Sequence, residues 1–188
     1  MALRLGHRQS QDFDFFSYES FEPESLLRLP YLKDAQINHR ANNTLSVVVE
    51  RGGAIKVSFF GDVQMGHVQE ADFAIEDAVP VASLLDLTAT KLKTVQQRAE
   101  AKDYLDVAAA LDAGINLAEA LSAARAIYGR AFNSIASLKA LSYFEDGNLG
   151  SIPERIRSRL LDAAQNVQID KLLQLTPKPG ITRQRSSQ

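Results

Sequence analysis

The sequence predicts an α+β protein, because strand signals fill its first half and helix signals fill its second half, with the change near Pro80. Of its 188 residues, 45% are hydrophobic and 23% are charged, which is the composition of a globular chain with one sizeable core. We expect a sheet core over residues 1–82, a helical part packed on it over 83–176, and a disordered tail over 177–188, which has two prolines and no large apolar cluster.

Charge and cysteine content exclude several classes of function. The 21 Lys and Arg residues against 23 Asp and Glu residues give a formal net charge of −2, so an RNA partner would need a local basic patch. The absence of cysteine excludes disulfide scaffolds, thiolate zinc sites and cysteine nucleophiles. No apolar run approaches the ~18–20 residues of a membrane-spanning helix, and Arg4, His7 and Arg8 interrupt any signal-peptide core, so we expect a cytoplasmic protein without a membrane partner.

The first half begins with a strand over residues 12–16, where acidic and aromatic residues alternate. The twofold repeat of a strand places Asp12 and Asp14 on one face and Phe13 on the other. Proline is tolerated in the first turn of a helix, so the Glu-Pro-Glu at 22–24 predicts a helix that continues to about Leu32.

Three further strands are expected over residues 35–40, 44–50 and 54–60. The glycine pair at 52–53 predicts a hairpin turn between the last two, because glycine supplies the positive φ that such turns require. The aromatic residues of these strands are assigned to the core: Phe13, Phe15, Phe16, Phe59 and Phe60.

In the second half, side chains that cap helices mark the helix starts. Ser83 begins a helix that runs through Val95, and a second helix over 102–111 ends at Gly114. Asn116, with Glu119 at the capping-box spacing, begins a third helix.

That third helix is expected to end at Gly129. Ser134 caps the next one, which runs to Gly147 with apolar residues on its buried face: Ile135, Leu138, Leu141 and Phe144. The capping-box spacing of Ser151 and Glu154 begins a long amphipathic helix that continues through Leu172.

The first candidate site is the pair Asp12 and Asp14. Two carboxylates at positions i and i+2 of a strand project to the same side and can share a divalent cation, as in sites of phosphoryl transfer. The alternative is a solvated strand face, which is the commoner origin of an isolated Asp-x-Asp.

The second candidate is a group of charges after Ser83. If one continuous helix carried Lys91, Arg98 and Lys102, these cations would form a stripe suited to phosphates. The alternatives are a solvated face, or surface salt bridges from Asp103 and Asp106 that contribute little.

Four segments together are more specific than either candidate. They are LGHRQSQDFDFF at 5–16, KVSFFG at 56–61, SLLDLTATKLK at 83–93 and RAEAKDYLD at 98–106. In order, residue type and spacing, the chain strongly resembles the AbiEii/AbiGii-type nucleotidyltransferase family over roughly residues 3–144. The resemblance implies a polymerase-β-like nucleotidyltransferase core, in which a small sheet presents two acids to Mg²⁺, together with a C-terminal helical part.

The resemblance also implies roles for residues of the first segment. Asp12 and Asp14 correspond to the metal ligands that bridge the triphosphate of an NTP. Ser10 corresponds to a position beside the nucleotide phosphates, where Arg8 assists. His7, in the turn before Arg8, is expected to be structural.

In the later segments, Lys91 corresponds to a phosphate-binding lysine, and Asp103 to an acid near the nucleotide that acts as a general base or orients other groups. The sequence departs from the family pattern at two places. Ser58 occupies a strand position where many such transferases have a third carboxylate. The family's Gly-Gly-Ser or Gly-Gly-Thr turn precedes the point at which this chain begins, so we expect either a shortened start or a chain that no longer binds nucleotide normally.

The sequence therefore predicts a Mg²⁺-dependent nucleotidyltransferase that resembles the toxin of a type IV toxin–antitoxin or abortive-infection system. The implied acceptor is RNA, such as a tRNA 3′ end, and the implied protein partner is a cognate antitoxin. Two alternatives stay open: a non-catalytic remnant of this fold that acts by protein binding, and, less favoured by the four matching segments, a helical interaction module without nucleotide chemistry.

Overall fold

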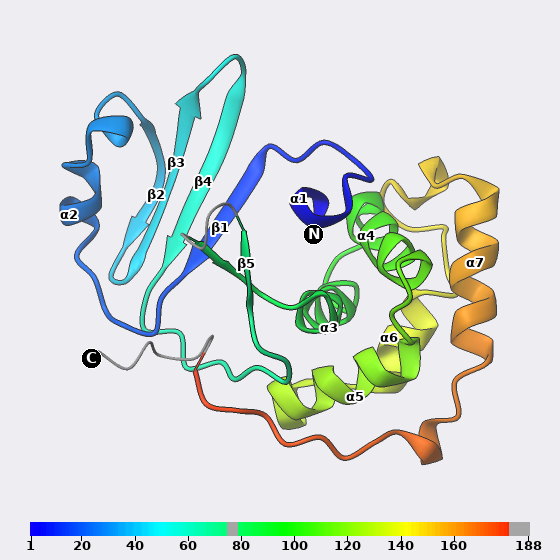
Figure 1. Cartoon of the computed structure of the whole chain (residues 1–188). Helices are drawn as coiled ribbons and strands as arrows, with labels where there is room; N and C mark the ends of the chain where they lie inside the picture. Colours follow the sequence, from blue (N-terminus) through cyan, green and yellow to red (C-terminus); the bar gives the residue numbers. More distant parts are fainter. Residues whose placement is uncertain (75–78, 181–188) are drawn as a thin grey trace. The chain divides into compact units, whose positions relative to one another are not determined.

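The computed structural model describes residues 1–74 and 79–180 (Figure 1). The chain divides into two compact units. The sheet unit comprises Arg8–Met65 with residues 179–180, and the helical unit comprises Met1–His7 and Gly66–Lys178. One β-rich and one α-rich unit confirm the predicted α+β class. The predicted division into a sheet core over residues 1–82 and a helical part over 83–176 stays a proposal.

The sheet unit is built on a four-stranded sheet with the strand order β1-β4-β3-β2. The strands are β1 (Asp12–Phe16), β2 (Gln36–Ala41), β3 (Thr44–Glu50) and β4 (Ala54–Phe60). β1 runs parallel to β4, and the other neighbours are antiparallel. All four were predicted, and Gly52 and Gly53, with φ of 70° and 148°, form the expected turn between β3 and β4.

The two faces of this sheet differ in chemistry. Leu45 and Val47 of β3 are fully buried on the face that the apolar side chains of residues 21–35 cover. The strand register places Asp14 beside Ser58 on the opposite face, and Asp12 projects to the same side. The acids are therefore kept apart from the apolar core of this unit.

The assignment of the β1 aromatic residues to the core is wrong. Phe13, Phe15 and Phe16 are 39%, 42% and 50% exposed. β1 is the edge strand of the sheet, whereas the covering segment packs mainly on β3, and two of the β1 aromatic residues, Phe15 and Phe16, instead stack on aromatic residues of β4. Phe15 and Phe59 stack with their ring centroids 5.3 Å apart.

The predicted helix from residue 22 to 32 is interrupted. It consists of α2 (Pro23–Leu27) followed by a separate 3₁₀ turn, η1 (Pro30–Leu32). Pro30 has no N–H to continue the helical hydrogen bonds, and it restrains Leu29 to an extended conformation with φ −67° and ψ 133°.

The helical unit has α3 (Leu84–Thr94) between α4 (Ala101–Asp112) and α5 (Leu117–Tyr128) (Figure 1). The remaining helices are α1 (Ala2–Leu5), α6 (Ser134–Ala140) and α7 (Glu154–Gln165). Leu85, Ala89 and Leu92 of α3 are buried in its core. An antiparallel pair of short strands, β5 (Asp72–Ala74) and β6 (Val79–Val81), was not predicted.

Two of the predicted helix caps are confirmed. The Ser83 hydroxyl accepts a hydrogen bond from the backbone N–H of Asp86 at 3.0 Å. The Asn116 side chain accepts from two backbone N–H groups of the first turn of α5, and Gly129 ends that helix with φ 52°. Side chains at these positions satisfy N–H groups that the helix itself leaves without partners.

The predicted starts of α6 and α7 are wrong. Asn133, not Ser134, caps α6, because its side-chain oxygen accepts from the N–H groups of Ile135 and Ala136 at 3.0 and 3.2 Å. The N-cap position of α7 is Pro153, while the Ser151 hydroxyl donates to the carbonyl of Asn148 at 2.7 Å. At α6 two adjacent polar side chains could act as the cap, whereas at α7 the serine lies two residues before the N-cap position and bonds locally to the backbone instead.

The predicted ends of these two helices also differ from the structure. α6 ends at Ala140 and α7 ends at Gln165, ahead of the expected Gly147 and Leu172. Ile135, placed on the buried face of α6, is 50% exposed.

The end of the described chain pairs with the helical unit. Lys178 lies in the segment expected to be disordered, yet its backbone exchanges two hydrogen bonds with that of His67, at 2.7 and 3.1 Å. Residues 181–188, the rest of that expectation, lie outside the described residues. In the part of the chain that the structure describes, no helix has the length and apolar character needed to cross a membrane.

Candidate active site

The first candidate site is the acidic face of β1, in the sheet unit. The side chains of Asp12 and Asp14 are exposed, and in the register with β4 they lie beside Lys56 and Ser58. The Ser10 hydroxyl donates to the backbone carbonyl of Asp12 at 3.2 Å, which closes the turn just before the strand.

The chemistry of this acid pair fits Mg²⁺. Proteins commonly bind Mg²⁺ through one or two carboxylates, and waters and substrate phosphates supply its other oxygen ligands. Within residues 1–74 and 79–180, no group of three or more His, Asp or Glu side chains could hold a metal ion. Ser58 supplies no third acid, and its buried hydroxyl lies 3.3 Å from that of Ser46. Asp12 and Asp14 can therefore provide two ligands, with the remainder coming from phosphate and water.

A second candidate site, in the helical unit, is an ion cluster. Asp103 and Asp106, one turn apart on α4, face α3, where Lys91 lies between them. The Lys91 Nζ is 2.7 Å from Asp103 Oδ1 and 2.7 Å from Asp106 Oδ2. The aspartate side chains are 0% and 1% exposed, and that of Lys91 is 22% exposed, so the two carboxylates are closed to solvent and the lysine is partly open to it.

Arg98, in the link between α3 and α4, completes the cluster from the other side. Its Nε and Nη2 donate to the two carboxylate oxygens of Asp103 at 2.8 and 3.3 Å. The predicted cationic stripe is wrong, because α3 ends at Thr94 and α4 begins at Ala101, so no continuous helix carries these cations. The expectation of weak surface salt bridges fails for the same aspartates, because both are buried.

His7 contributes a contact that the sequence did not indicate. Its Nε2 lies 2.7 Å from Asp106 Oδ1, across 99 positions of the chain. Gly6, with φ 60°, ends α1 and turns the chain just before His7. Arg4 holds α1 in place by donating to the carbonyl of Ala82 at 3.2 Å and by an ion pair with Asp72.

The cluster is electrically balanced, because the charges of Lys91 and Arg98 equal those of Asp103 and Asp106. Burial raises the pKa of Asp103, but hydrogen bonds and charge from Arg98 and Lys91 lower it by more, so the pKa lies below its ordinary value. Asp103 is therefore ionised at neutral pH, with both oxygens occupied. This arrangement can hold the Lys91 ammonium in one place, with part of its side chain open to solvent.

Asp86, within one of the four motif segments, has a structural role. Its buried carboxylate accepts hydrogen bonds from the backbone N–H groups of Val68 and Gln69 at 3.0 and 3.1 Å. It thereby ties the segment before β5 to the first turn of α3.

The structure thus brings together some of the predicted site residues. Lys91 and Asp103 are in direct contact within the helical unit. Arg8, Ser10, Asp12 and Asp14 belong to the sheet unit, where Arg8 donates to the carbonyl of Gln9 at 3.0 Å. The i, i+3 spacing of Asp103 and Asp106 indicated a shared face, but no local pattern linked His7 to them.

Comparison with known protein families gives a match that covers most of the chain. A family model with the description nucleotidyl transferase AbiEii toxin, type IV TA system, matches residues 1–182. No curated protein and no solved structure matches the chain.

Proposed function

The chain belongs to the AbiEii family of nucleotidyltransferase toxins from type IV toxin–antitoxin systems, and on that premise we propose that it transfers a nucleotide from an NTP to an acceptor in a Mg²⁺-dependent reaction. The observation that carries this proposal is the pair of exposed carboxylates, Asp12 and Asp14, on one face of β1. An exposed acid pair on a strand is suited to a cation that also contacts a polyanionic substrate.

Asp12 and Asp14 would hold Mg²⁺, which when bound neutralises phosphate charge and polarises the phosphorus–oxygen bonds that change. Their own part is to fix the position of the triphosphate relative to β1. Ser10 and Arg8, directly before the strand, would bind phosphate oxygens through a hydroxyl and a guanidinium.

Lys91 would bind phosphate with the ammonium that Asp103 and Asp106 hold in place. We assign Asp103 an orienting role over a general-base role. A carboxylate with a lowered pKa and two occupied oxygens is a weak proton acceptor. His7 would position Asp106 in the same way, through its 2.7 Å contact.

The proposal includes the acceptor, the partner and the location. We take the acceptor to be RNA, with a tRNA 3′ end as the first candidate, the protein partner to be a cognate antitoxin, and the compartment to be the cytoplasm. Type IV toxin–antitoxin membership supports the antitoxin at the level of the family.

Calorimetry with each of the four NTPs, with and without Mg²⁺, tests the proposal, followed by transfer of radiolabelled nucleotide to bulk tRNA. We expect Mg²⁺-dependent binding that Asp12→Asn and Asp14→Asn each weaken at least tenfold, because each removes one of two charged ligands. Asp34→Asn, which removes an exposed acid of the same unit away from β1, should leave binding unchanged.

Two results would contradict the proposal. Equal binding by the parent and both β1 variants would overturn the metal assignment. The absence of Mg²⁺-dependent NTP binding, in a chain that remains folded by circular dichroism, would favour the alternative of a non-catalytic remnant that acts by protein binding.

A further inference from the structure

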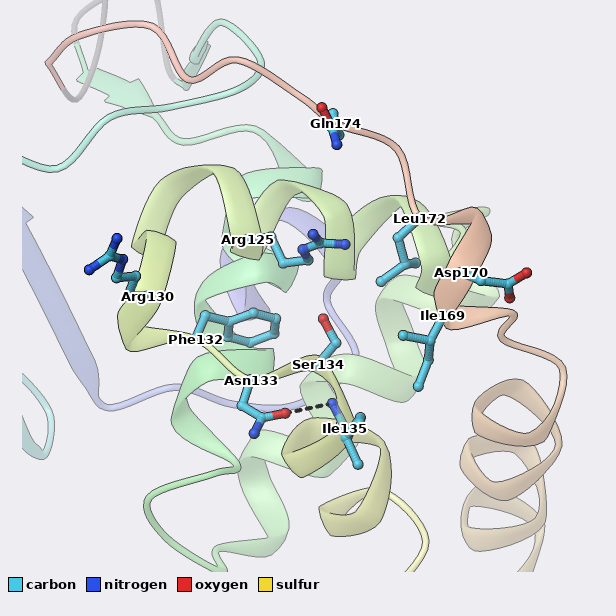
Figure 2. Close-up of a pocket in the computed structure, with 10 residues that line it drawn as sticks. All are labelled: Arg125, Arg130, Phe132, Asn133, Ser134, Ile135, Ile169, Asp170, Leu172 and Gln174. Carbon is cyan, nitrogen blue, oxygen red and sulfur yellow. Dashed lines mark hydrogen bonds between the residues drawn. The ribbon is translucent and has the colours of Figure 1, made fainter.

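The helical unit has a cavity of about 590 Å³ that shares no residue with the ion cluster. It lies beside the end of α5, the start of α6 and the 3₁₀ turn η4 (Ile169–Lys171) (Figure 2). The residues that matter for its chemistry are Arg125, Arg130, Phe132, Ser134, Ile135 and Ile169. Its volume lies in the range of sites that hold small ligands or a few side chains of a peptide.

The wall of this cavity carries uncompensated positive charge. Arg125 and Arg130 are exposed and, across residues 1–74 and 79–180, neither makes an ion pair. Asp170 also lines the cavity, but in Figure 2 its carboxylate points away from both arginines. The local charge therefore favours an anionic group.

A buried hydroxyl without a partner lies in the same cavity. Ser134 is 8% exposed, and among the described residues its Oγ has no hydrogen-bond partner. Figure 2 shows this hydroxyl beside the ring of Phe132 and on the side of Ser134 that faces Arg125. Asn133 takes the capping role at α6, which leaves the Ser134 hydroxyl unused. A buried polar group without a partner is unfavourable, so a ligand that satisfies it is stabilised.

The rim of the cavity is aliphatic. Ile135 is 50% exposed and Ile169 is 40% exposed, and both flank the opening. A nucleic-acid backbone would favour a continuous cationic surface without an acid or exposed isoleucines. Aliphatic side chains beside arginines match a peptide in which an apolar side chain neighbours a carboxylate.

We propose that this cavity binds a segment of a partner protein that presents an aliphatic side chain next to a carboxylate. The carboxylate would bind Arg125 and the Ser134 hydroxyl, and the aliphatic side chain would cover Ile135 and Ile169. The proposal does not depend on nucleotidyl transfer, because neither Lys91 nor β1 takes part in it.

NMR spectroscopy of the ¹⁵N-labelled full chain tests the site. The probe is the blocked peptide acetyl-Leu-Glu-Leu-Glu-amide, and the matched control peptide is acetyl-Leu-Gln-Leu-Gln-amide. We expect the acidic peptide to shift the amide signals of Ser134, Ile135 and Ile169. The dissociation constant from this titration should be at least fivefold lower for the acidic peptide than for the neutral one. Arg125→Gln should weaken binding about fivefold, and the matched variant Arg155→Gln on α7, outside the cavity, should not change it.

Several outcomes would overturn the proposal. They are the absence of shifts at these amides, equal affinity for the two peptides, and unchanged affinity in Arg125→Gln. If hexauridylate shifted the same amides and bound more tightly than the acidic peptide, the cavity would be assigned to RNA and the proposal would also be overturned. Ser134→Ala separates binding from folding, because it removes only an unpaired hydroxyl. This variant should bind the acidic peptide more weakly, and its melting temperature should be unchanged or higher.

Discussion

Lys91 differs from an isolated phosphate-binding lysine in that two buried carboxylates already surround its ammonium. Each contact limits the positions of a flexible side chain that would otherwise sample many rotamers. The aspartates also reduce the net charge that Lys91 presents. The cluster is therefore better suited to fixing where a phosphate binds than to attracting it from a distance.

Asp103→Ala is expected to destabilise the protein by about 2–4 kcal/mol, because Arg98 loses its buried carboxylate partner and Lys91 keeps only one of its two, Asp106. This expected loss of unfolding free energy is slightly smaller than the usual loss when a fully buried ion pair is broken, since the side chains of both cations keep some contact with water. Urea unfolding followed by circular dichroism measures the change.

Asp112→Ala is the matched control on the same helix. Asp112 pairs with Arg159 at 3.0 Å, and the two side chains are 56% and 40% exposed. Exposed pairs contribute little, so the expected loss is about 0.5 kcal/mol. Equal losses of unfolding free energy in the two variants would show that the buried cluster stabilises the protein no more than an exposed ion pair does.

At the scale of elements, the sequence predicted the four strands of the main sheet and the first helix caps well, but it missed β5 and β6 and predicted later helix starts poorly. β3 and β4 have strong alternation and a glycine turn between them, so their limits followed from local pattern. At the start of α6 the predicted cap was Ser134, but the adjacent Asn133 is also a residue type that caps helices, and only packing decides between the two. The shared face of the two acids on β1 could be predicted in the same way as β3, because the alternation of side chains along a strand alone sets which of them share a face.

The two rivals at α6 give a direct test. Asn133→Ala should cost about 1 kcal/mol of unfolding free energy, because two backbone N–H groups lose their acceptor. Ser134→Ala should cost nothing measurable. Thermal unfolding of both variants measures this, and a larger loss for Ser134→Ala would reverse the assignment of the cap.

A second element-scale prediction concerns the loop that supports the start of α4. Gly147 has φ 55°, and a Cβ at this position would lie 2.1 Å from the carbonyl oxygen of Ala99. Next to it, the Asn148 side chain accepts from the N–H of Ala101 at 2.7 Å. Gly147→Ala should therefore destabilise the protein by roughly 1–3 kcal/mol and disturb the cluster on α4.

Gly150→Ala is the control for this substitution, because its added Cβ meets no atom within 4 Å. It should leave the midpoint of urea unfolding unchanged. If Gly147→Ala also left the midpoint unchanged, the close approach to Ala99 would not constrain the loop.

At the scale of the whole molecule, the part of the site that the sequence could not predict is the part made by distant residues. His7 and Asp106 meet across 99 positions, and Lys91 meets Asp103 only because the chain turns between α3 and α4. Periodicity reports which residues share a face of one element, but it does not report which elements pack together. The resemblance to a family predicted Lys91 and Asp103 as site residues, and the structure shows the contacts that Asp106, His7 and Arg98 make in this cluster.

The stability of the protein should fall at both ends of the pH range, because different side chains titrate at each end. The pKa of Asp103 is lower in the folded protein than its ordinary value near 4, so the stabilisation it contributes is present above about pH 4 and is lost as pH falls below it. Burial raises the pKa of Tyr104 and of Tyr128, although a hydrogen bond with Thr90 partly lowers the latter. The stabilisation that these two tyrosines contribute is present below about pH 10 and is lost as pH rises through their raised pKa values.

Urea unfolding between pH 2.5 and 11 should therefore give a plateau near neutrality with a loss of stability on each side. Tyr128→Phe should reduce the loss at alkaline pH, because a phenyl ring in this buried position has no proton to release. Tyr18→Phe, at a position that is 49% exposed, should leave the alkaline slope unchanged. An alkaline slope that is the same in Tyr128→Phe and in the parent protein would show that unfolding at high pH is not driven by ionisation of Tyr128.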